Sequence, residues 1–314
     1  MVKKYIILLV FALQGILTIE AQSNSNTYEF LNVPVSAHSA ALGGQNISIV
    51  EDDVTLMFTN PALLTNVSNN TLNFDYTSYI NSTNKLSAAF ARQAGERTTW
   101  ALAAEYLNYG KMDETDELGA TMGTFSPNDI AIQGTFAYLM SDYWSGAVSA
   151  KMLFSNYGPY NAFAIAADLG INYYNSDAGL SLSFVGRNFG GQINPLHEER
   201  ETLPFDFAVG ISKDLGHAPV RLSLTFDDLT HWKNINFIQH CILGADLFIG
   251  STAWLGIGYN FRRSHEMKTA DGSSHWAGLS VGGGLNIKKV KLGLAWGKYH
   301  VSANSLTANI SFAF

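Results

Sequence analysis

The chain has 314 residues, of which only 14% are charged, 12% are aromatic and 28 are glycine, and its formal net charge is −7. So few charges on so long a chain disfavour a surface that faces water on all sides. The acidic balance, without a basic tract, disfavours nucleic acid as a partner. The single cysteine, Cys241, excludes an internal disulfide, and we expect it to be a small apolar residue of a strand.

The first residues predict a secretory signal peptide over 1–21. Lys3 and Lys4 form a basic start, an apolar run follows, and Ala21 supplies a small residue at the cleavage position. After this segment, no apolar run approaches the roughly 18 residues that a membrane-spanning helix needs. We therefore expect an exported protein without membrane helices.

From Leu72 onward, apolar and polar residues alternate in segments of about ten residues. Period-two segments of this length are typical of transmembrane strands that have one lipid-facing and one lumen-facing side. The sequence predicts fourteen such strands. They begin near Leu72, Lys85, Thr98, Ile130, Trp144, Tyr160, Gly179, Phe205, Val220, Cys241, Ala253, Trp276, Val290 and Asn304.

The connections between these strands give an independent indication of the same fold. Short joins at 93–97, 141–143, 175–178, 214–219, 250–252 and 288–289 alternate with longer ones at 110–129, 188–204, 230–240 and 262–275. An outer-membrane barrel has short periplasmic turns and longer outer loops. The sequence thus predicts an all-β protein, a 14-stranded antiparallel transmembrane β-barrel over 72–314, with both barrel ends periplasmic.

Residues 22–71 precede the first strand and have a different character. Gly43 and Gly44 permit close backbone packing, and Asn60, Pro61 and Ala62 form a favourable helix start, because asparagine caps and proline fits the first helical position. An apolar segment of this size needs burial, and the barrel lumen can supply it. We expect an N-terminal hatch inside the barrel.

Charged residues at lumen-facing positions are balanced in sign. Unpaired charges in a narrow lumen are costly, whereas opposite charges can satisfy one another, and a conduction path for one sign of charge would show a one-sided set. We predict an internal ion-pair network that holds the hatch and the wall together. Its members are Glu105, Lys151, Asp168, Arg187, Asp206, Arg221, Asp227 and Lys291.

One stretch carries a resemblance to known families. FLNVPVSA at 30–37 runs into AALGG at 40–44, and the acidic 51–53 and Asn60-Pro61-Ala62 follow ahead of the strands. These motifs resemble the FadL-like long-chain fatty acid transporter fold, in which an amino-terminal hatch plugs a fourteen-stranded barrel. More closely, they resemble the PorV/PorQ family of the type IX secretion system in Bacteroidota. Chain length favours the shorter, PorQ branch of that family.

The resemblance implies a place in the cell-surface attachment complex, with PorU, PorV-like and PorZ-like proteins, that anchors exported cargo to lipopolysaccharide. It implies a non-enzymatic component that lies in outer-membrane lipid and holds a PorZ-like surface protein. It implies no cofactor.

Apolar residues in the predicted outer loops are candidates for partner docking, since such residues can mark an interaction surface. They are Phe189, Trp232 and Phe237. Folding back over the barrel mouth explains them equally well.

The alternative function is FadL-like transport of a hydrophobic ligand through an apolar pocket between hatch and wall. Its expected lining is Phe58, Leu63 and Leu64, together with lumen-facing Leu107 or Leu153. A catalytic or metal site is not expected: the eight histidines lack a zinc-binding spacing. The acidic run 113–117 is a candidate for binding a divalent cation, with a solvated loop as the preferred interpretation.

Overall fold

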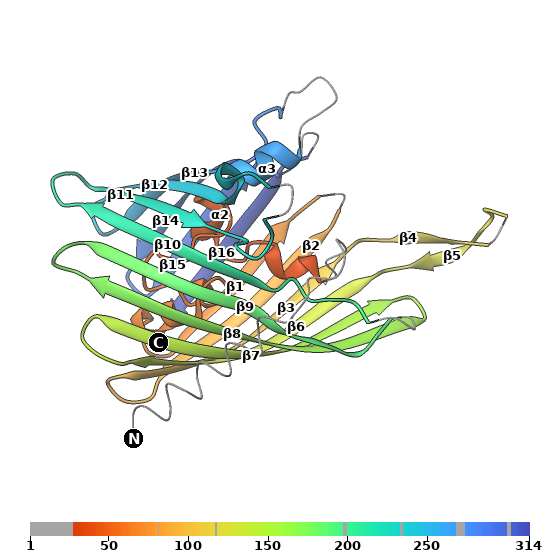
Figure 1. Ribbon diagram of the computed structural model, residues 1–314, viewed down its shortest axis with the longest axis horizontal. Helices are drawn as coiled ribbons and strands as arrows, with labels where there is room; N and C mark the ends of the chain where they lie inside the picture. The colour runs from red at the N-terminus through yellow and green to blue at the C-terminus, as the bar shows by residue number, and fades with distance from the viewer. Residues whose placement is uncertain are drawn as a thin grey trace.

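The computed structural model describes residues 28–80, 82–116, 118–196, 200–232, 235–267, 274–299 and 303–314, so the expected signal peptide lies outside the described residues. Fourteen strands close into one antiparallel barrel, in which β1 pairs with both β2 and β16 (Figure 1). The predicted fold class is confirmed. The barrel strands are β1 (Thr71–Ser78), β2 (Asn84–Gln93), β3 (Thr98–Asn108), β6 (Asn128–Leu139), β7 (Trp144–Tyr157), β8 (Tyr160–Asn175), β9 (Leu180–Asn194), β10 (Asp206–Leu215), β11 (Val220–Phe226), β12 (Cys241–Ile249), β13 (Ala253–Asn260), β14 (Leu279–Ile287), β15 (Val290–Gly297) and β16 (Ser305–Ala313).

Side-chain alternation along the strands separates an apolar outside from a packed inside. On β3, Trp100 and Leu102 point outward and are exposed, whereas Ala101, Ala103 and Glu105 point inward and are buried. The same parity holds around the barrel, so large apolar side chains cover its outer surface. An apolar surface of this size is favourable in contact with lipid and unfavourable in contact with water. None of the helices in the described residues is long and apolar enough to span a membrane.

Two predicted strand boundaries are wrong. The expected loop 188–204 begins too early, because β9 continues to Asn194 past a bulge at Asn188, whose φ of 58° is left-handed. The bulge shifts the register and hides the continuing strand from a period-two pattern. Near the other end of the chain, β14 begins at Leu279 and not at Trp276, because His275 and Trp276 both adopt positive φ in a turn.

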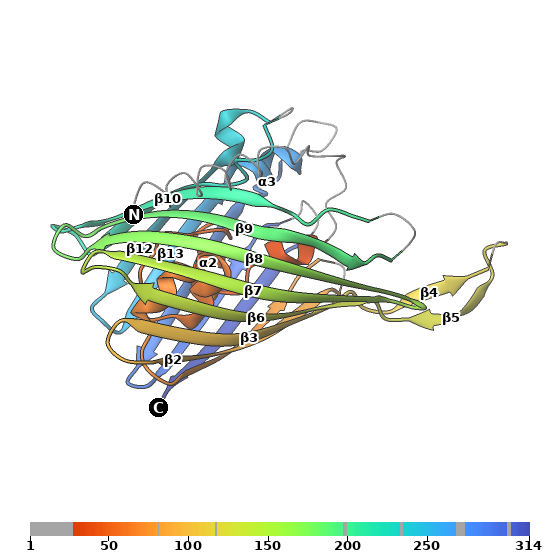
Figure 2. The same cartoon turned by 60° about the horizontal axis from the view of Figure 1, so that its bottom comes forward.

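A separate hairpin projects beyond the barrel rim at the long-loop end. It consists of β4 (Met112–Thr115) and β5 (Thr121–Phe125), within the join predicted as a long loop (Figure 2). Two further short helices lie at the same end, η4 (Phe237–His240) and α3 (Phe261–Glu266).

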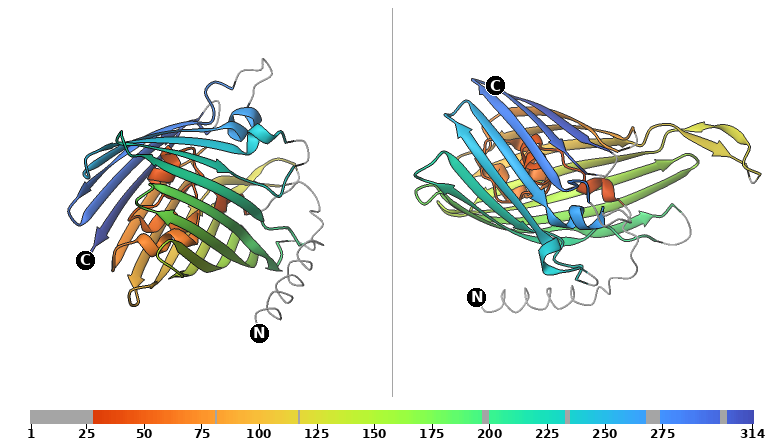
Figure 3. Two further views of the ribbon diagram at one scale, coloured as in Figure 1. Left: turned by 60° about the vertical axis from the view of Figure 1, so that its left-hand side comes forward. Right: turned by 90° about the horizontal axis from the view of Figure 1, so that it is seen from above.

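Residues 28–70 form the hatch, which lies inside the ring of strands (Figure 3). It contains η1 (Glu29–Asn32), α2 (Ala37–Ala41), η2 (Val54–Phe58) and η3 (Pro61–Asn66). The side chains of Ser36 and Asn60 cap α2 and η3 by accepting hydrogen bonds from the backbone N–H groups of Ser39 and Ala62. Burial of each large apolar side chain stabilises the hatch by about 1.5–3 kcal/mol. The fully buried ones include Leu42, Ile47, Ile49, Leu56, Met57 and Leu63.

The hatch backbone touches the wall where glycine leaves room. Gly258 on β13 points inward, and a β-carbon added there would lie 2.2 Å from the Gly43 nitrogen and from the Leu42 carbonyl carbon. These are backbone atoms that cannot rotate away. Gly43 itself has φ of 98°, a conformation that other residues rarely adopt. The close contact between hatch and wall therefore depends on both glycines.

We predict that Gly258→Ala destabilises the barrel by about 1–3 kcal/mol, because the added methyl group overpacks the contact with the hatch. The urea midpoint of the detergent-solubilised protein, followed by gel mobility without heating, measures the change. Gly134→Ala is the matched control: it also lies in a barrel strand, but an added β-carbon meets nothing within 4 Å. Equal midpoints for the two variants would contradict the close hatch contact.

Candidate functional site

Buried ion pairs line the inner wall of the barrel. Lys151 Nζ lies 2.6 Å from Asp168 Oδ2, and Lys85 Nζ lies 2.6 Å from Glu105 Oε2. All four residues are at most 6% exposed. A buried charge that loses its partner is strongly destabilising, so these pairs fix the inward side chains of the neighbouring strands.

Further ion pairs tie the hatch to the wall. Arg221 Nη2 on β11 lies 2.5 Å from Glu51 Oε1 of the hatch and 2.7 Å from Asp246 Oδ2 on β12. Lys291 Nζ on β15 lies 2.5 Å from Asp52 Oδ2. The hatch is thus held by charges from several strands.

Lys85 makes a third attachment. Besides its ion pair with Glu105, its ammonium group donates hydrogen bonds to the carbonyl oxygens of Phe30 at 3.0 Å and Val33 at 2.8 Å. These carbonyls belong to η1 and the residue that follows it, so Lys85 fixes the start of the hatch. All three of these contacts are buried.

His38 joins the same charge cluster from α2. Its Nδ1 lies 2.6 Å from Glu51 Oε2 and its Nε2 lies 2.7 Å from Asp246 Oδ1. Its ring stacks on Trp254 with centroids 3.6 Å apart. Two carboxylate partners require both ring nitrogens to donate, which is the doubly protonated, cationic form.

Electrostatics in this cluster oppose the effect of burial. Burial lowers the pKa of His38, but the charges of Glu51 and Asp246 outweigh it and raise that pKa to about 9. Burial raises the pKa of Glu51, but His38 and Arg221 outweigh it and lower that pKa to about 2. His38 and Arg221 are therefore both cationic at neutral pH, opposite two carboxylates.

The structure gives an oppositely charged partner to each of the eight residues proposed for the lumen network. Lys151 pairs with Asp168, and Arg187 contacts Asp206 at 2.6 Å and also Asp227. The other three pair outside the predicted set, with partners that the sequence analysis missed. Those partners are Lys85 for Glu105, Glu51 and Asp246 for Arg221, and Asp52 for Lys291.

The residues of the hatch motif all lie at buried positions. Gly44 sits next to Pro34 and the Arg263 guanidinium. The Asn60 amide donates to the Ile47 carbonyl at 3.0 Å, and its Oδ1 accepts from the Ala62 N–H at 3.0 Å. Asn60 thereby joins two hatch segments, with Pro61 at the first position of η3.

The candidate docking residues divide into two groups. Phe189 lies in β9, not in a loop, and its ring packs 4.7 Å from that of Phe205; its assignment to a loop was wrong because of the bulge at Asn188. Trp232 and Phe237 do lie at the long-loop end and are 48% and 61% exposed.

The residues proposed to line an apolar pocket are instead packed against one another and their neighbours. Leu63 is buried among other hatch residues, and Leu64 is buried in a cluster of hatch and wall residues against which Phe58 packs. Leu107 and Leu153 are buried against the start of the hatch. Two cavities lie instead at the two ends of the hatch. One of about 520 Å³ touches the short turns and is lined partly by His38 and Glu51; the other, of about 700 Å³, touches the long loops.

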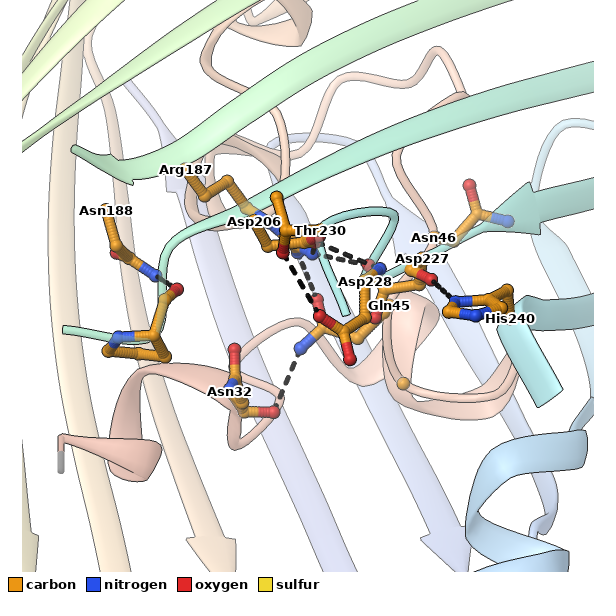
Figure 4. A network of polar contacts seen from close by, with 12 residues as sticks. Asn32, Gln45, Asn46, Arg187, Asn188, Asp206, Asp227, Asp228, Thr230 and His240 are labelled. Carbon is orange, nitrogen blue, oxygen red and sulfur yellow. Dashed lines mark hydrogen bonds and ion pairs between the residues drawn. The ribbon is translucent and has the colours of Figure 1, made fainter. Parts of the chain in front are cut away.

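Both cavities have charged walls. The outer one contains the network of Arg187, Gln45, Asp206 and Asp227, in which Arg187 donates to Gln45 Oε1 at 2.8 Å (Figure 4). In the described part of the chain, no three or more His, Cys, Asp or Glu residues are grouped in a way that could hold a metal ion.

Comparison with known proteins gives similarity at the level of the fold. No model of a protein family matches the chain, and no curated protein matches it. Among solved structures, the toluene transporter TodX of Pseudomonas putida has 11% identity and a TM-score of 0.61, over 89% of this chain and 97% of that one. The CymD monoaromatic hydrocarbon channel has 12% identity and a TM-score of 0.58, over 90% and 98%. A FadL homologue of Pseudomonas aeruginosa has 9% identity and a TM-score of 0.55, over 89% and 98%.

The chain has the FadL-like barrel fold. The similarity to TodX extends over almost the whole of both chains. This chain itself has the fourteen strands in closed antiparallel order and the hatch inside them. At these identities the similarity concerns architecture, and function has to be argued from the side chains.

We predict that the stability of the barrel falls between pH 6 and pH 10 through His38. Its folded pKa of about 9 lies above the ordinary 6.5, so its contribution is fully present below pH 6.5 and is lost as the pH rises through 9. The loss is up to about 3 kcal/mol. Urea midpoints at the two pH values measure it, with His38→Gln as the control that lacks the titrating ring. An equal fall in wild type and variant would contradict the role of His38.

Proposed function

We propose that this protein is a non-enzymatic outer-membrane anchor, a barrel with a fixed hatch whose long-loop face docks a surface partner. The observation that carries the proposal is the attachment of the hatch. Lys85, Arg221 and Lys291 come from three different strands, and each contacts a hatch residue through an ion pair or hydrogen bonds. Moving the hatch aside would break the Glu51–Arg221, His38–Asp246 and Asp52–Lys291 pairs. Breaking the first two, which are largely buried, is strongly destabilising.

The long-loop face supports a docking role. The β4–β5 hairpin stands apart from the barrel sheet, and an isolated two-stranded hairpin is marginally stable in water. Near its tip Leu118 is 93% exposed and Met122 is 72% exposed. Together with Trp232 and Phe237 they offer apolar surface outside the membrane belt, which favours contact with another protein.

The partner proposed is a PorZ-like surface protein in the attachment complex of a type IX secretion system, with PorU and PorV-like members, in a bacterium of the Bacteroidota. Support for this assignment comes from the sequence motifs at 30–44 and 60–62, which resemble the PorV/PorQ family. The solved structures reported above do not bear on this partner.

The second candidate is a channel for hydrophobic ligands. The TodX and CymD structures favour this function over the attachment role, since TodX is a toluene transporter and CymD is a monoaromatic hydrocarbon channel. The charged walls of both cavities and the packed Leu63, Leu107 and Leu153 speak against an apolar route past the hatch.

Affinity isolation from detergent-solubilised native membranes tests the anchor function. We expect a large surface protein to co-purify with the wild type, and its recovery to fall at least about fivefold in Trp232→Ala/Phe237→Ala, because truncating exposed aromatic anchors removes binding energy. Trp144→Ala is the control: this tryptophan is 47% exposed but lies at the short-turn end.

Partner capture that is unchanged in the double variant would contradict docking through these loops. Isolation of a solitary barrel, together with toluene or fatty acid uptake that depends on the protein, would replace the anchor with the channel.

A further inference from the structure

The outer cavity carries an excess of negative charge. It has a volume of about 700 Å³ and lies between the hatch and the long loops. Leaving His231 out of the count, five carboxylates face three guanidinium groups, so the lining has a net charge of −2. The acidic residues are Glu29, Asp206, Asp227, Asp228 and Glu266, and the basic ones are Arg187, Arg262 and Arg263.

In the more deeply buried part of this cavity, two carboxylates share one guanidinium group. Arg187 Nη2 contacts Asp206 Oδ2 at 2.6 Å and also Asp227 (Figure 4). The second oxygen of Asp206, Oδ1, is buried without a hydrogen-bond partner among the described residues, and so is Arg187 Nε. Asp206 is only 6% exposed. One guanidinium group cannot compensate two carboxylates, and a buried carboxylate oxygen without a hydrogen-bond partner is costly.

The other arginines of the cavity have partners of their own. Arg262 pairs with Asp228 and, at 2.6 Å, with Glu266. Arg263 lies over the Tyr299 ring at 3.7 Å and donates to the Gly43 carbonyl at 3.3 Å. The described part of the chain therefore offers Asp227 no cation except the shared Arg187.

We propose that this cavity binds the side chain of a lysine or arginine carried by the protein that docks on the long-loop face. The positive charge would pair with Asp227, whose side chain is 21% exposed and so can be reached. Arg187 could then pair with Asp206 alone. Tyr79 and Tyr109 also line this cavity, and aromatic rings close to a cation attract it.

A basic side chain suits the cavity better than a metal ion, since the described acidic residues do not form a metal-binding group. The source of the side chain rests on the proposed anchor function, whereas the cavity's preference for a cation rests on its own charges.

The test uses N-acetyl-arginine amide as the probe and N-acetyl-citrulline amide, which has nearly the same shape without the charge, as its comparison. Calorimetric titration into the detergent-solubilised full chain should show binding of the arginine probe at least about tenfold tighter than the citrulline probe, and weaker at high salt. Asp227→Asn should weaken binding of the arginine probe at least about tenfold, and Asp227→Glu should retain it.

Asp214→Asn is the matched control, because it removes one carboxylate from the cavity at the short-turn end. Gel mobility without heating verifies that each variant folds. If Asp227→Asn does not fold, the proposal is tested on the wild type alone, by the difference in affinity between the two probes and by its dependence on salt. Equal binding of the two probes, no binding of the arginine probe at millimolar concentration, or equal weakening by Asp214→Asn would overturn the proposal. If the arginine probe does not bind but the surface partner is still captured, only the cation-binding cavity is refuted. If the partner is not captured but the probe still binds, only the anchor function is refuted.

Discussion

Charge pairing inside a closed, poorly solvated lumen is the constraint on which this structure depends. The apolar belt requires a lipid exterior, which leaves the interior as the place for nearly every polar and charged side chain of the strands. There a charge without a partner is costly, because little water can solvate it. Hatch and wall therefore have to supply one another's counter-charges. Glu51 and Arg221, which are 170 positions apart in the chain, meet at 2.5 Å for this reason.

This constraint separates fold from function. A FadL-like barrel with a hatch can be a channel when the hatch leaves a route and an anchor when it does not. Here the hatch is held by cations of β2, β11 and β15 and by the cationic His38 of its own helix, and its apolar side chains are packed. At the outer end, long loops, a projecting hairpin and an acidic cavity meet. The exposed apolar residues and the acidic cavity on which the proposed anchor function rests lie at that end.

Much of the architecture could be predicted from the sequence, because period-two alternation follows directly from strand geometry. Prediction failed where the backbone departs from that period. The bulge at Asn188 breaks the alternation, so Phe189 was assigned to a loop although it lies in β9. The positive φ at Trp276 belongs to a turn, so β14 begins later than predicted. Strand parity indicated which charges face inward, but not their partners. Lys85 stands at the edge of its strand, where parity is weakly defined, and His38 looked like a scattered histidine because Asp246 lies 208 positions away. Such contacts follow from packing in three dimensions.

If buried ion pairs keep the hatch in place, ion current through the purified protein in a planar lipid bilayer should depend on them. We expect no stepwise current for the wild type at neutral pH. We expect current steps in Arg221→Gln, which leaves Glu51 and Asp246 without their guanidinium partner. Stable current steps of equal size in the wild type and the variant would contradict this role of the ion pairs.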